Sequence, residues 1–372
     1  MRNVSGSLLA IFAATSGHSG VDRVLRNLIS EFAARGLRVD LLHVRNHGPH
    51  LETIPPTVRV VELGTSHVNT SLFALIRYLR REKPAALLTD KDRVNRIALL
   101  ARWLSGVATH VAVRMGTTVS ANLARRGPLD RWIQLASIRM LYRWADAVLV
   151  PSQGAADDLA RVANLAHHRI TVVPSPVVTP QLMSDSNLEV SHPWLTHKDQ
   201  PVILGVGELG SRKDFATLVR AFARLRAKRK CRLIILGRGK QHDKLMELAK
   251  NLGVADDVSF PGFVANPYAY MAKADLFVLS SVCEGSPVVL MEALATGTPV
   301  VSTDCPSGPR EILQNGKYGA LVTIGDDVAL AEAMYTTLQN PPSKDSLRSA
   351  VRPFAIKESA TSYLAALGFA SS

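Results

Sequence analysis

Residues 280–311 read SSVCEGSPVVLMEALATGTPVVSTDCPSGPRE, and they contain most of one βαβ unit. An apolar run ends at Leu279, and a short turn containing Glu284 follows it. The stretch Val288–Ala295 then has the composition of a buried helix, and Pro299–Ser302 that of a buried strand. A strand, a turn, a helix and a second apolar strand in this order predict a parallel α/β sheet.

The same alternation extends through the rest of the chain. The expected strands are Leu8–Ala14, Leu37–Val44, Val58–Val61, Ala85–Thr89, Thr109–Val113, Ala147–Val150, Ile170–Val173, Val202–Val206, Cys231–Leu236, Val258–Phe260, Leu276–Leu279, Pro299–Ser302 and Ala320–Val322. The expected helices are Val21–Ala34, Ser71–Arg81, Arg93–Leu104, Asp130–Trp144, Gly154–Ala163, Phe215–Ala227, Lys244–Asn251, Val288–Ala295, Val328–Leu338 and Ser346–Leu367, the last broken at Pro353.

A stretch with five prolines and no clear period, residues 174–201, interrupts this alternation. We therefore expect two Rossmann-like domains, 1–175 and 201–345, joined by a linker at 176–200. Residues 346–372 form a helical segment that we expect to pack back on the first domain. Because ligands bind beyond the carboxyl ends of such strands, two doubly wound sheets facing across a cleft would place the chemistry in that cleft.

Composition excludes several classes of protein. The chain has 372 residues, of which 47% are hydrophobic, so it can bury two cores. Its three cysteines, Cys231, Cys283 and Cys305, show no disulfide or zinc pattern and indicate a reducing compartment. No apolar run approaches the roughly 18 residues of a spanning helix. Arg2 and the run Leu8–Ala14 could pass for a short signal peptide, but the glycines and amphipathic helix that follow favour a first buried strand.

The net charge of +13 lies mostly in the first half of the chain. Residues 1–185 hold 23 Lys/Arg against 13 Asp/Glu, and residues 186–372 hold 21 against 18. Such an asymmetry indicates an anionic partner, which could be a phosphate, a membrane surface or a nucleic acid. We find no nucleic-acid recognition motif, and aromatic residues do not alternate with the basic ones, so nucleic acid is not expected as a partner.

Two carboxylates in residues 280–311 are candidates for ligand binding. Ser286 is the expected N-cap of the following helix and Pro287 its first residue, so unpaired N–H groups there would favour an anion. Glu284 lies in the turn and Glu292 eight residues later on the helix. They could hold hydroxyl groups of one extended ligand, or they could be an ordinary loop charge and an ordinary helix carboxylate.

A second candidate is GVGELGSRKDF, residues 205–215, which follows one expected strand and precedes a helix. Its glycines allow a backbone to approach a phosphate, and Arg212 and Lys213 could neutralise a diphosphate. A plain strand-to-helix turn with solvated charges explains the same residues. LGRG at 236–239, which contains Gly237, is a weaker glycine signal at another strand end.

Together these motifs resemble the retaining glycosyltransferases of family 4, which have the GT-B fold. EGSPVVLMEALATGTPVV (284–301) resembles the family's Glu-x7-Glu signature, and GELGSRKDFATLVRAF (207–222) resembles its diphosphate-binding turn. FPGFVANPYAYMAKADLFVLSS (260–281) fits the stretch between them. SGHSGVDRVLRNLISEFAARGLRVDLLHV (16–44) resembles the opening of the acceptor-binding domain. The likeness is specific in 205–322 and weak in 46–145.

The resemblance implies a role for each matching residue. Glu284 would contact hydroxyls of the donor sugar, Glu292 the ribose, and Arg212 and Lys213 the diphosphate. The remaining donor-binding positions implied are Gly17, Gly20, Gly207, Gly237, Gly285, Ser286, Pro287 and Val288. The implied enzyme is a hexosyltransferase that uses a nucleotide sugar, with a UDP-sugar favoured, and needs no cofactor or metal.

The sequence departs from the family pattern at two acceptor-side positions. Many relatives have a histidine after the strand that corresponds to Thr109–Val113, where this chain has Arg114. Ser175 stands where an asparagine is frequent. Asp90-Lys91-Asp92 resembles a metal-binding Asp-x-Asp, but its place at a helix start favours an N-cap or first-turn acid at Asp92. A GT-B epimerase and a non-catalytic GT-B-like binding protein are the alternative functions.

The basic first half further suggests a peripheral enzyme on the inner, cytoplasmic face of the cell membrane. In a helix over Asp130–Trp144, Arg139 and Arg143 lie four residues apart, with Trp132 and Ala136 above them. A basic helix with aromatic residues suits an anionic membrane surface and a lipid-diphosphate-linked or glycan acceptor. Arg114, Arg139 and Arg143 are therefore the expected acceptor or membrane residues. The alternative is a solvated basic face over a buried helix.

Overall fold

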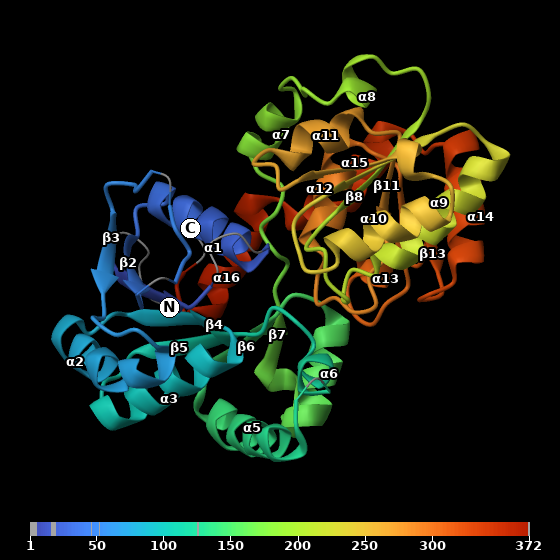
Figure 1. Cartoon of the computed structure of the whole chain (residues 1–372). Coiled ribbons are helices and arrows are strands. Elements are labelled where there is room, and N and C mark those ends of the chain that lie inside the picture. Colours follow the sequence, from blue (N-terminus) through green and yellow to red (C-terminus); the bar gives the residue numbers. More distant parts are fainter. Residues whose placement is uncertain (1–5, 16–19, 46, 52, 125, 371–372) are drawn as a thin grey trace. The chain divides into compact units, whose positions relative to one another are not determined.

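A computed structural model describes residues 6–15, 20–45, 47–51, 53–124 and 126–370. The chain forms two compact units, which are described separately (Figure 1). Unit 1 comprises Met1–Val177 and Phe354–Ser372, and unit 2 comprises Val178–Pro353. Both are α/β units with a parallel sheet, as expected for two Rossmann-like domains.

Unit 1 is built on a seven-stranded parallel sheet in the order β3-β2-β1-β4-β5-β6-β7. Its strands are β1 (Leu8–Ala13), β2 (Arg38–His43), β3 (Val58–Glu62), β4 (Ala86–Asp90), β5 (His110–Arg114), β6 (Ala147–Val150) and β7 (Ile170–Val172). Its α-helices are α1 (Gly20–Ala34), α2 (Leu72–Glu82), α3 (Asp92–Ser105), α4 (Val119–Leu123), α5 (Pro128–Leu141), α6 (Gln153–Ala163) and α16 (Ile356–Ala366). The 3-10 turns are η1 (Val68–Ser71), η2 (Tyr142–Trp144) and η3 (His167–Arg169), and η5 (Arg352–Phe354) spans the boundary with unit 2.

The inner strands β1 and β4 of unit 1 are buried because helices cover both sides of the sheet, whereas the edge strands β3 and β7 are partly exposed. Helices α2, α3, α5 and α6 pack side by side on one face, and α1 packs with α16 on the other. β1 lies in the middle of the sheet and is almost fully buried. The run Leu8–Ala14 therefore contains the first core strand that we preferred over a signal peptide.

Unit 2 has a six-stranded parallel sheet in the order β10-β9-β8-β11-β12-β13. Its strands are β8 (Val202–Val206), β9 (Arg232–Leu236), β10 (Val258–Gly262), β11 (Leu276–Leu279), β12 (Val300–Thr303) and β13 (Ala320–Val322). Its helices are α7 (Pro180–Ser186), α8 (Pro193–Thr196), α9 (Phe215–Lys228), α10 (His242–Asn251), α11 (Pro267–Lys273), α12 (Val288–Thr296), α13 (Pro309–Ile312), α14 (Asp327–Gln339) and α15 (Lys344–Ala350), with a 3-10 turn η4 (Ala255–Asp257).

The boundaries of the units differ from the sequence-based ones in two places. The segment expected to be a linker, 176–200, contains α7 and α8 and belongs mostly to unit 2. Proline at the first helical position starts both helices, and the Asn266 side chain donates to the Asp185 carbonyl oxygen at 2.8 Å. The final segment divides near Pro353, so α15 stays in unit 2 and α16 packs in unit 1.

Each sheet has one switch point, where successive connections leave in opposite directions. It lies between β1 and β4 in unit 1 and between β8 and β11 in unit 2. In open α/β sheets, ligands bind beyond the carboxyl ends of the strands at this point. The loops after β8 and β11 are therefore the first place to look for a site in unit 2. Among the described residues, no helix is both long and apolar enough to span a membrane.

Candidate functional site

Two loops meet at the switch point of unit 2: residues 207–214 after β8 and residues 280–287 after β11. Their backbones are joined, because the Val282 N–H donates to the Arg212 carbonyl oxygen at 2.9 Å. The Ser280 hydroxyl donates to the carbonyl oxygen of Lys213 at 2.8 Å. The two candidate motifs, far apart in sequence, thus form one structural element.

Glu284 is the centre of this element. Its Oε1 accepts from Lys213 Nζ at 2.7 Å and from Ser281 Oγ at 2.7 Å, and its Oε2 accepts from Arg212 Nη1 at 3.1 Å. Glu284 and Lys213 are buried, whereas the Arg212 side chain is 37% exposed. Burial alone would raise the pKa of Glu284, but the charges of Lys213 and Arg212 outweigh it, so its pKa is lowered. The result is a buried carboxylate held ionised by two cations.

Two glycines accommodate this packing. The Lys213 side chain lies over Gly207, where an added Cβ would come within 2.8 Å of Lys213 Cε. Gly237 has a φ of +140°, and a Cβ there would lie 1.8 Å from the Gly207 carbonyl oxygen. The backbones after β8 and β9 therefore touch directly, which only glycine at 237 permits.

The start of α12 differs from the expected one. Pro287 is the N-cap, with a ψ of 97° in the extended region, and the helix begins at Val288. Contrary to what the sequence predicts, Ser286 is therefore not the N-cap and Pro287 is not the first helical residue. Pro287 is fixed there by close packing, because a Cβ on Gly308 would lie 2.6 Å from its Cδ. Ser307 Oγ donates to the Gly285 carbonyl oxygen at 3.0 Å, which joins the loop after β12 to this turn.

Glu292 lies on α12 and has no exposed surface. The Tyr268 hydroxyl approaches its Oε1 at 3.4 Å, the long end of a hydrogen bond. Glu284 and Glu292 therefore have different partners: the first contacts two cations, and the second contacts a phenol from α11. Sequence reasoning missed Ser281 and Tyr268. The paired serines directly after an apolar strand were the signal that could have found Ser281.

Arg114 is buried among partners inside unit 1, so it is not part of an exposed membrane surface, and its expected acceptor contact stays a prediction. It is 2% exposed and forms an ion pair with Asp90, and its Nε donates to the Tyr363 hydroxyl of α16 at 2.7 Å. Burial would lower the pKa of Arg114, but Tyr363 and Asp90 outweigh this effect and raise it. Arg114 therefore joins β4, β5 and the last helix from inside unit 1.

The two carboxylates of the Asp-x-Asp triplet have separate partners. Asp90 is paired with Arg114, and Asp92, in the first turn of α3, accepts from Gln134 at 2.7 Å and pairs with Arg96 at 2.9 Å. The N-cap of α3 is Lys91. Of the two expected roles for Asp92, N-cap or first-turn acid, the structure therefore shows the second. Among the described residues, no group of three or more His, Cys, Asp or Glu side chains could hold a metal ion.

The remaining predicted positions are in unit 1. Gly17 lies outside the described residues, and Gly20 is the first residue of α1. Arg139 and Arg143 are exposed, as expected, but the α-helix ends at Leu141 and Arg143 lies in η2. Arg139 Nε donates to the Val162 carbonyl oxygen at 3.0 Å.

Two family models together match almost the whole chain. The model for glycosyl transferases group 1 matches residues 189–354, and the model for the glycosyl transferase 4-like domain matches residues 19–176. The chain belongs to the family 4-like glycosyltransferases. The expected activity class, a hexosyltransferase, is confirmed with the family.

This glycosyltransferase is similar to several bacterial enzymes. It is 29% identical over 353 residues, 92% of each chain, to the N-acetylgalactosamine-N,N'-diacetylbacillosaminyl-diphospho-undecaprenol 4-alpha-N-acetylgalactosaminyltransferase of Campylobacter jejuni. It is 34% identical over 194 residues to the lipopolysaccharide core biosynthesis glycosyltransferase LpsE of Rhizobium meliloti, covering 52% of this chain and 54% of that one.

Solved structures share its fold at low identity. The outer core galactosyltransferase WaaB in its apo form aligns with a TM-score of 0.75 and 19% identity over 97% of this chain and 99% of the other. Anabaena Alr3699/HepE in complex with UDP aligns with a TM-score of 0.77 and 17% identity over the same shares. At this identity the likeness shows the GT-B fold.

Proposed function

We propose that this enzyme is a retaining hexosyltransferase that moves a sugar from a nucleotide diphosphate sugar, with a UDP-sugar favoured, to a glycan or a lipid-diphosphate-linked acceptor. The observation that supports this proposal is the convergence of Arg212 and Lys213 on Glu284 at the switch point of unit 2. Two cations and a carboxylate in one place suit a ligand with a diphosphate at one end and hydroxyl groups at the other.

The chemistry follows from where charge develops. The bond between the anomeric carbon and the diphosphate oxygen breaks, and the negative charge that appears on the leaving group is stabilised by Arg212 and Lys213. The acceptor hydroxyl attacks from the same face, its oxygen bonds to the anomeric carbon, and its proton passes to the leaving phosphate. The configuration at that carbon is retained, and no metal is needed.

Glu284 has two roles in this proposal. Before the donor binds, it neutralises Lys213 and Arg212, which keeps a buried lysine from standing without a counterion. When the diphosphate takes over the cations, a Glu284 oxygen becomes available for hydroxyl groups of the sugar. The carboxylate thus acts as a clamp on the donor and not as a covalent nucleophile.

Relatives support the substrate classes. The name of the Campylobacter enzyme specifies a diphospho-undecaprenol-linked sugar acceptor, and that of LpsE specifies lipopolysaccharide core biosynthesis. HepE has been solved with UDP and with UDP-glucose. By analogy, we place this enzyme in polysaccharide or lipid-linked glycan biosynthesis, on the cytoplasmic face of a membrane, with unit 2 binding the donor and unit 1 the acceptor.

A panel of nucleotide sugars tests this proposal. A donor at a hundred times its Kd adds roughly 2.7 kcal/mol to stability, so thermal shift will identify the base and sugar. Transfer of the best donor to a synthetic lipid-diphosphate sugar is then followed with and without EDTA, and NMR gives the configuration of the product. We expect a retained configuration and full activity in EDTA.

Each other outcome points to a different function. Conversion of the donor without acceptor would identify an epimerase, and donor binding without any reaction would identify a non-catalytic protein. Loss of activity in EDTA that manganese restores would contradict the metal-free mechanism.

A further inference from the structure

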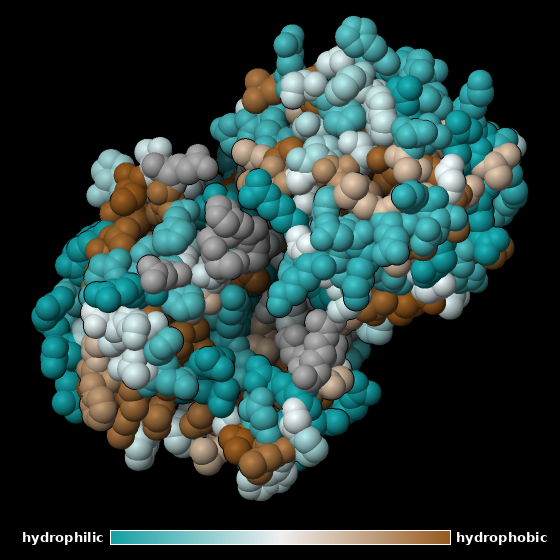
Figure 2. Space-filling view, in the orientation of Figure 1, coloured by the Kyte–Doolittle hydropathy of each residue, from teal (hydrophilic) through white to brown (hydrophobic). Residues whose placement is uncertain are grey.

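Helix α5 presents an unusual face to solvent. Leu129, Trp132, Ile133 and Met140 are 71%, 67%, 48% and 58% exposed, and Ala136 between them is exposed as well. Their spacing of three and four residues places all five on one strip of the helix, which we call the α5 strip. Figure 2 shows brown, hydrophobic side chains at the lower edge of unit 1 over α5, next to teal, hydrophilic ones.

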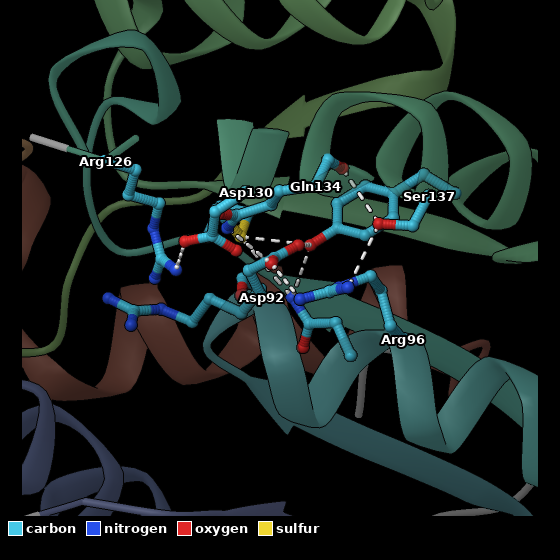
Figure 3. Close-up of polar contacts among 10 residues, drawn as sticks. Asp92, Arg96, Arg126, Asp130, Gln134 and Ser137 are labelled. Atoms are coloured by element: carbon cyan, nitrogen blue, oxygen red, sulfur yellow. Dashed lines mark hydrogen bonds and ion pairs between the residues drawn. The ribbon is translucent and has the colours of Figure 1, made fainter. Parts of the chain in front are cut away.

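The opposite face of α5 is firmly attached to α3. Gln134 donates to Asp92 at 2.7 Å, and Arg96 donates to Ser137 Oγ at 3.0 Å (Figure 3). Ile138 is fully buried. The α5 strip is therefore not a core face displaced outward, since the helix already has its core face. At the C-terminal end of α5, Trp103, itself 62% exposed, stacks on Trp144 with ring centroids 5.6 Å apart.

Arginines lie beside the strip, with Arg139 three residues after Ala136 and Arg143 three residues after Met140. Residues 126–144 contain four arginines and one acidic residue, Asp130, which Arg126 neutralises at 2.7 Å (Figure 3). Arg131, Arg139 and Arg143 are exposed. A second copy of the chain would bring these like charges against one another across the interface, whereas an anionic bilayer offers phosphates to the arginines and acyl chains to the strip.

We propose that the α5 strip inserts into the interface of an anionic lipid bilayer and that the neighbouring arginines bind its headgroups. This inference deepens the proposed function, because an enzyme that takes a lipid-linked acceptor must work at a membrane surface. It also adds a contribution to the expected membrane binding, which the sequence alone attributes mainly to the charges of Arg139 and Arg143. Because the exposed strip adds an apolar contribution that salt does not screen, binding should survive high salt in part.

Sedimentation with vesicles of phosphatidylcholine and phosphatidylglycerol, at a ratio of about two to one, measures the binding without any substrate. We expect the full chain to bind these vesicles and to keep part of this binding at about 0.5 M salt. Trp132→Ser/Met140→Ser should lower the partition coefficient at least about tenfold. The matched control Met246→Ser/Val328→Ser removes two apolar side chains of unit 2 that are 50% and 58% exposed, and it should bind like the parent.

Fluorescence and activity complete the test. Lipids brominated on the acyl chain should quench tryptophan emission in the parent and much less in Trp132→Phe, which keeps the strip apolar. The strip double variant should still glycosylate a short soluble acceptor. Parent protein that ignores vesicles, a strip variant that binds equally well, or a concentration-dependent dimer that the strip variant abolishes would each overturn the proposal. None of these results depends on donor identity, so failure of docking and failure of the transfer reaction are distinguishable.

Discussion

In unit 2, the strands that flank the switch point, β8 and β11, end in loops that carry Arg212, Lys213 and Glu284, and Arg212 is partly exposed. In unit 1 the equivalent strands are β1 and β4, and β4 ends at Asp90, whose partner Arg114 is buried. Both places pair acid with base. The difference lies in access: a charged cluster open on one side can exchange partners with a ligand, whereas the buried Asp90–Arg114 pair joins two strands to the last helix.

The closed cluster should be the more sensitive to mutation. Arg114→Leu leaves Asp90 buried without its counterion, so we expect the free energy of unfolding to fall by about 3–5 kcal/mol. Urea denaturation of the full chain measures this change. Arg81→Leu, in which a 67% exposed arginine of the same unit is removed, should change stability by less than about 0.5 kcal/mol. Equal stability of both variants would show that the Asp90–Arg114 pair does not contribute to the free energy of unfolding.

At the open cluster, the largest effect should be on catalysis. Glu284→Gln should lower kcat about 100-fold or more, because the sugar loses its clamp, which is comparable to losing one transition-state hydrogen bond. Binding of the nucleotide diphosphate should not weaken, since the cations are freed from their counterion. Steady-state kinetics and calorimetry with UDP separate these two effects. Glu247→Gln, an exposed acid on α10, serves as the control, and weaker UDP binding by Glu284→Gln would contradict the exchange of partners.

The two cations should differ in their effect on stability. Lys213→Ala and Arg212→Ala should each weaken UDP binding by roughly 1.5–3 kcal/mol, the value of a charge-assisted hydrogen bond. Only Lys213→Ala should also lower the free energy of unfolding, because Lys213 is buried against Gly207 and holds Glu284, whereas Arg212 is 37% exposed. Calorimetry and thermal denaturation of the same samples give both quantities. Equal destabilisation by the two variants would contradict this division.

The smallest expected effect is on the pH dependence of stability. The pKa of Glu284 is lowered from its ordinary value of 4.5, so the unfolded chain binds more protons at that site than the folded one below this pH. The contribution of Glu284 is therefore complete above pH 4.5 and is lost as the pH falls toward the folded pKa. Stability of Glu284→Gln should fall less steeply below pH 4.5 than that of the parent. Parallel curves would show that Glu284 does not titrate this way.

Much of this comparison was predictable from sequence, but not all of it. Short apolar strands alternating with helices predicted both sheets, and the motifs around Lys213 and Glu284 predicted which strand ends to examine. That these motifs bond to each other depends on tertiary packing over 71 residues, which spacing does not report. The burial of Arg114 was not predictable for the same reason, because its partner Tyr363 lies 249 residues away and nothing local marks an arginine as buried.

Two sequence-based expectations differ from the structure for another reason: the helix start at Ser286 and Pro287, and the linker at 176–200. Pro287 suits the first position of a helix by its φ, but its place is decided by packing against Gly308. The prolines in 176–200 predict a linker without regular structure, whereas Pro180 and Pro193 start short helices. A proline indicates the boundary of a helix or strand, but it does not indicate whether that element precedes or follows the proline.

The position of α16 has a consequence for the order of events during synthesis. Unit 1 is discontinuous, since its last helix emerges from the ribosome only after all of unit 2 has been made. Until then Arg114 and Asp90 lack the contact with Tyr363, and the part of the sheet that α16 covers in the folded unit stays exposed to water. The second unit, which is continuous, is therefore able to fold first, although domains usually fold in the order in which they are translated. The nascent enzyme would acquire its donor-side fold before its first domain is closed.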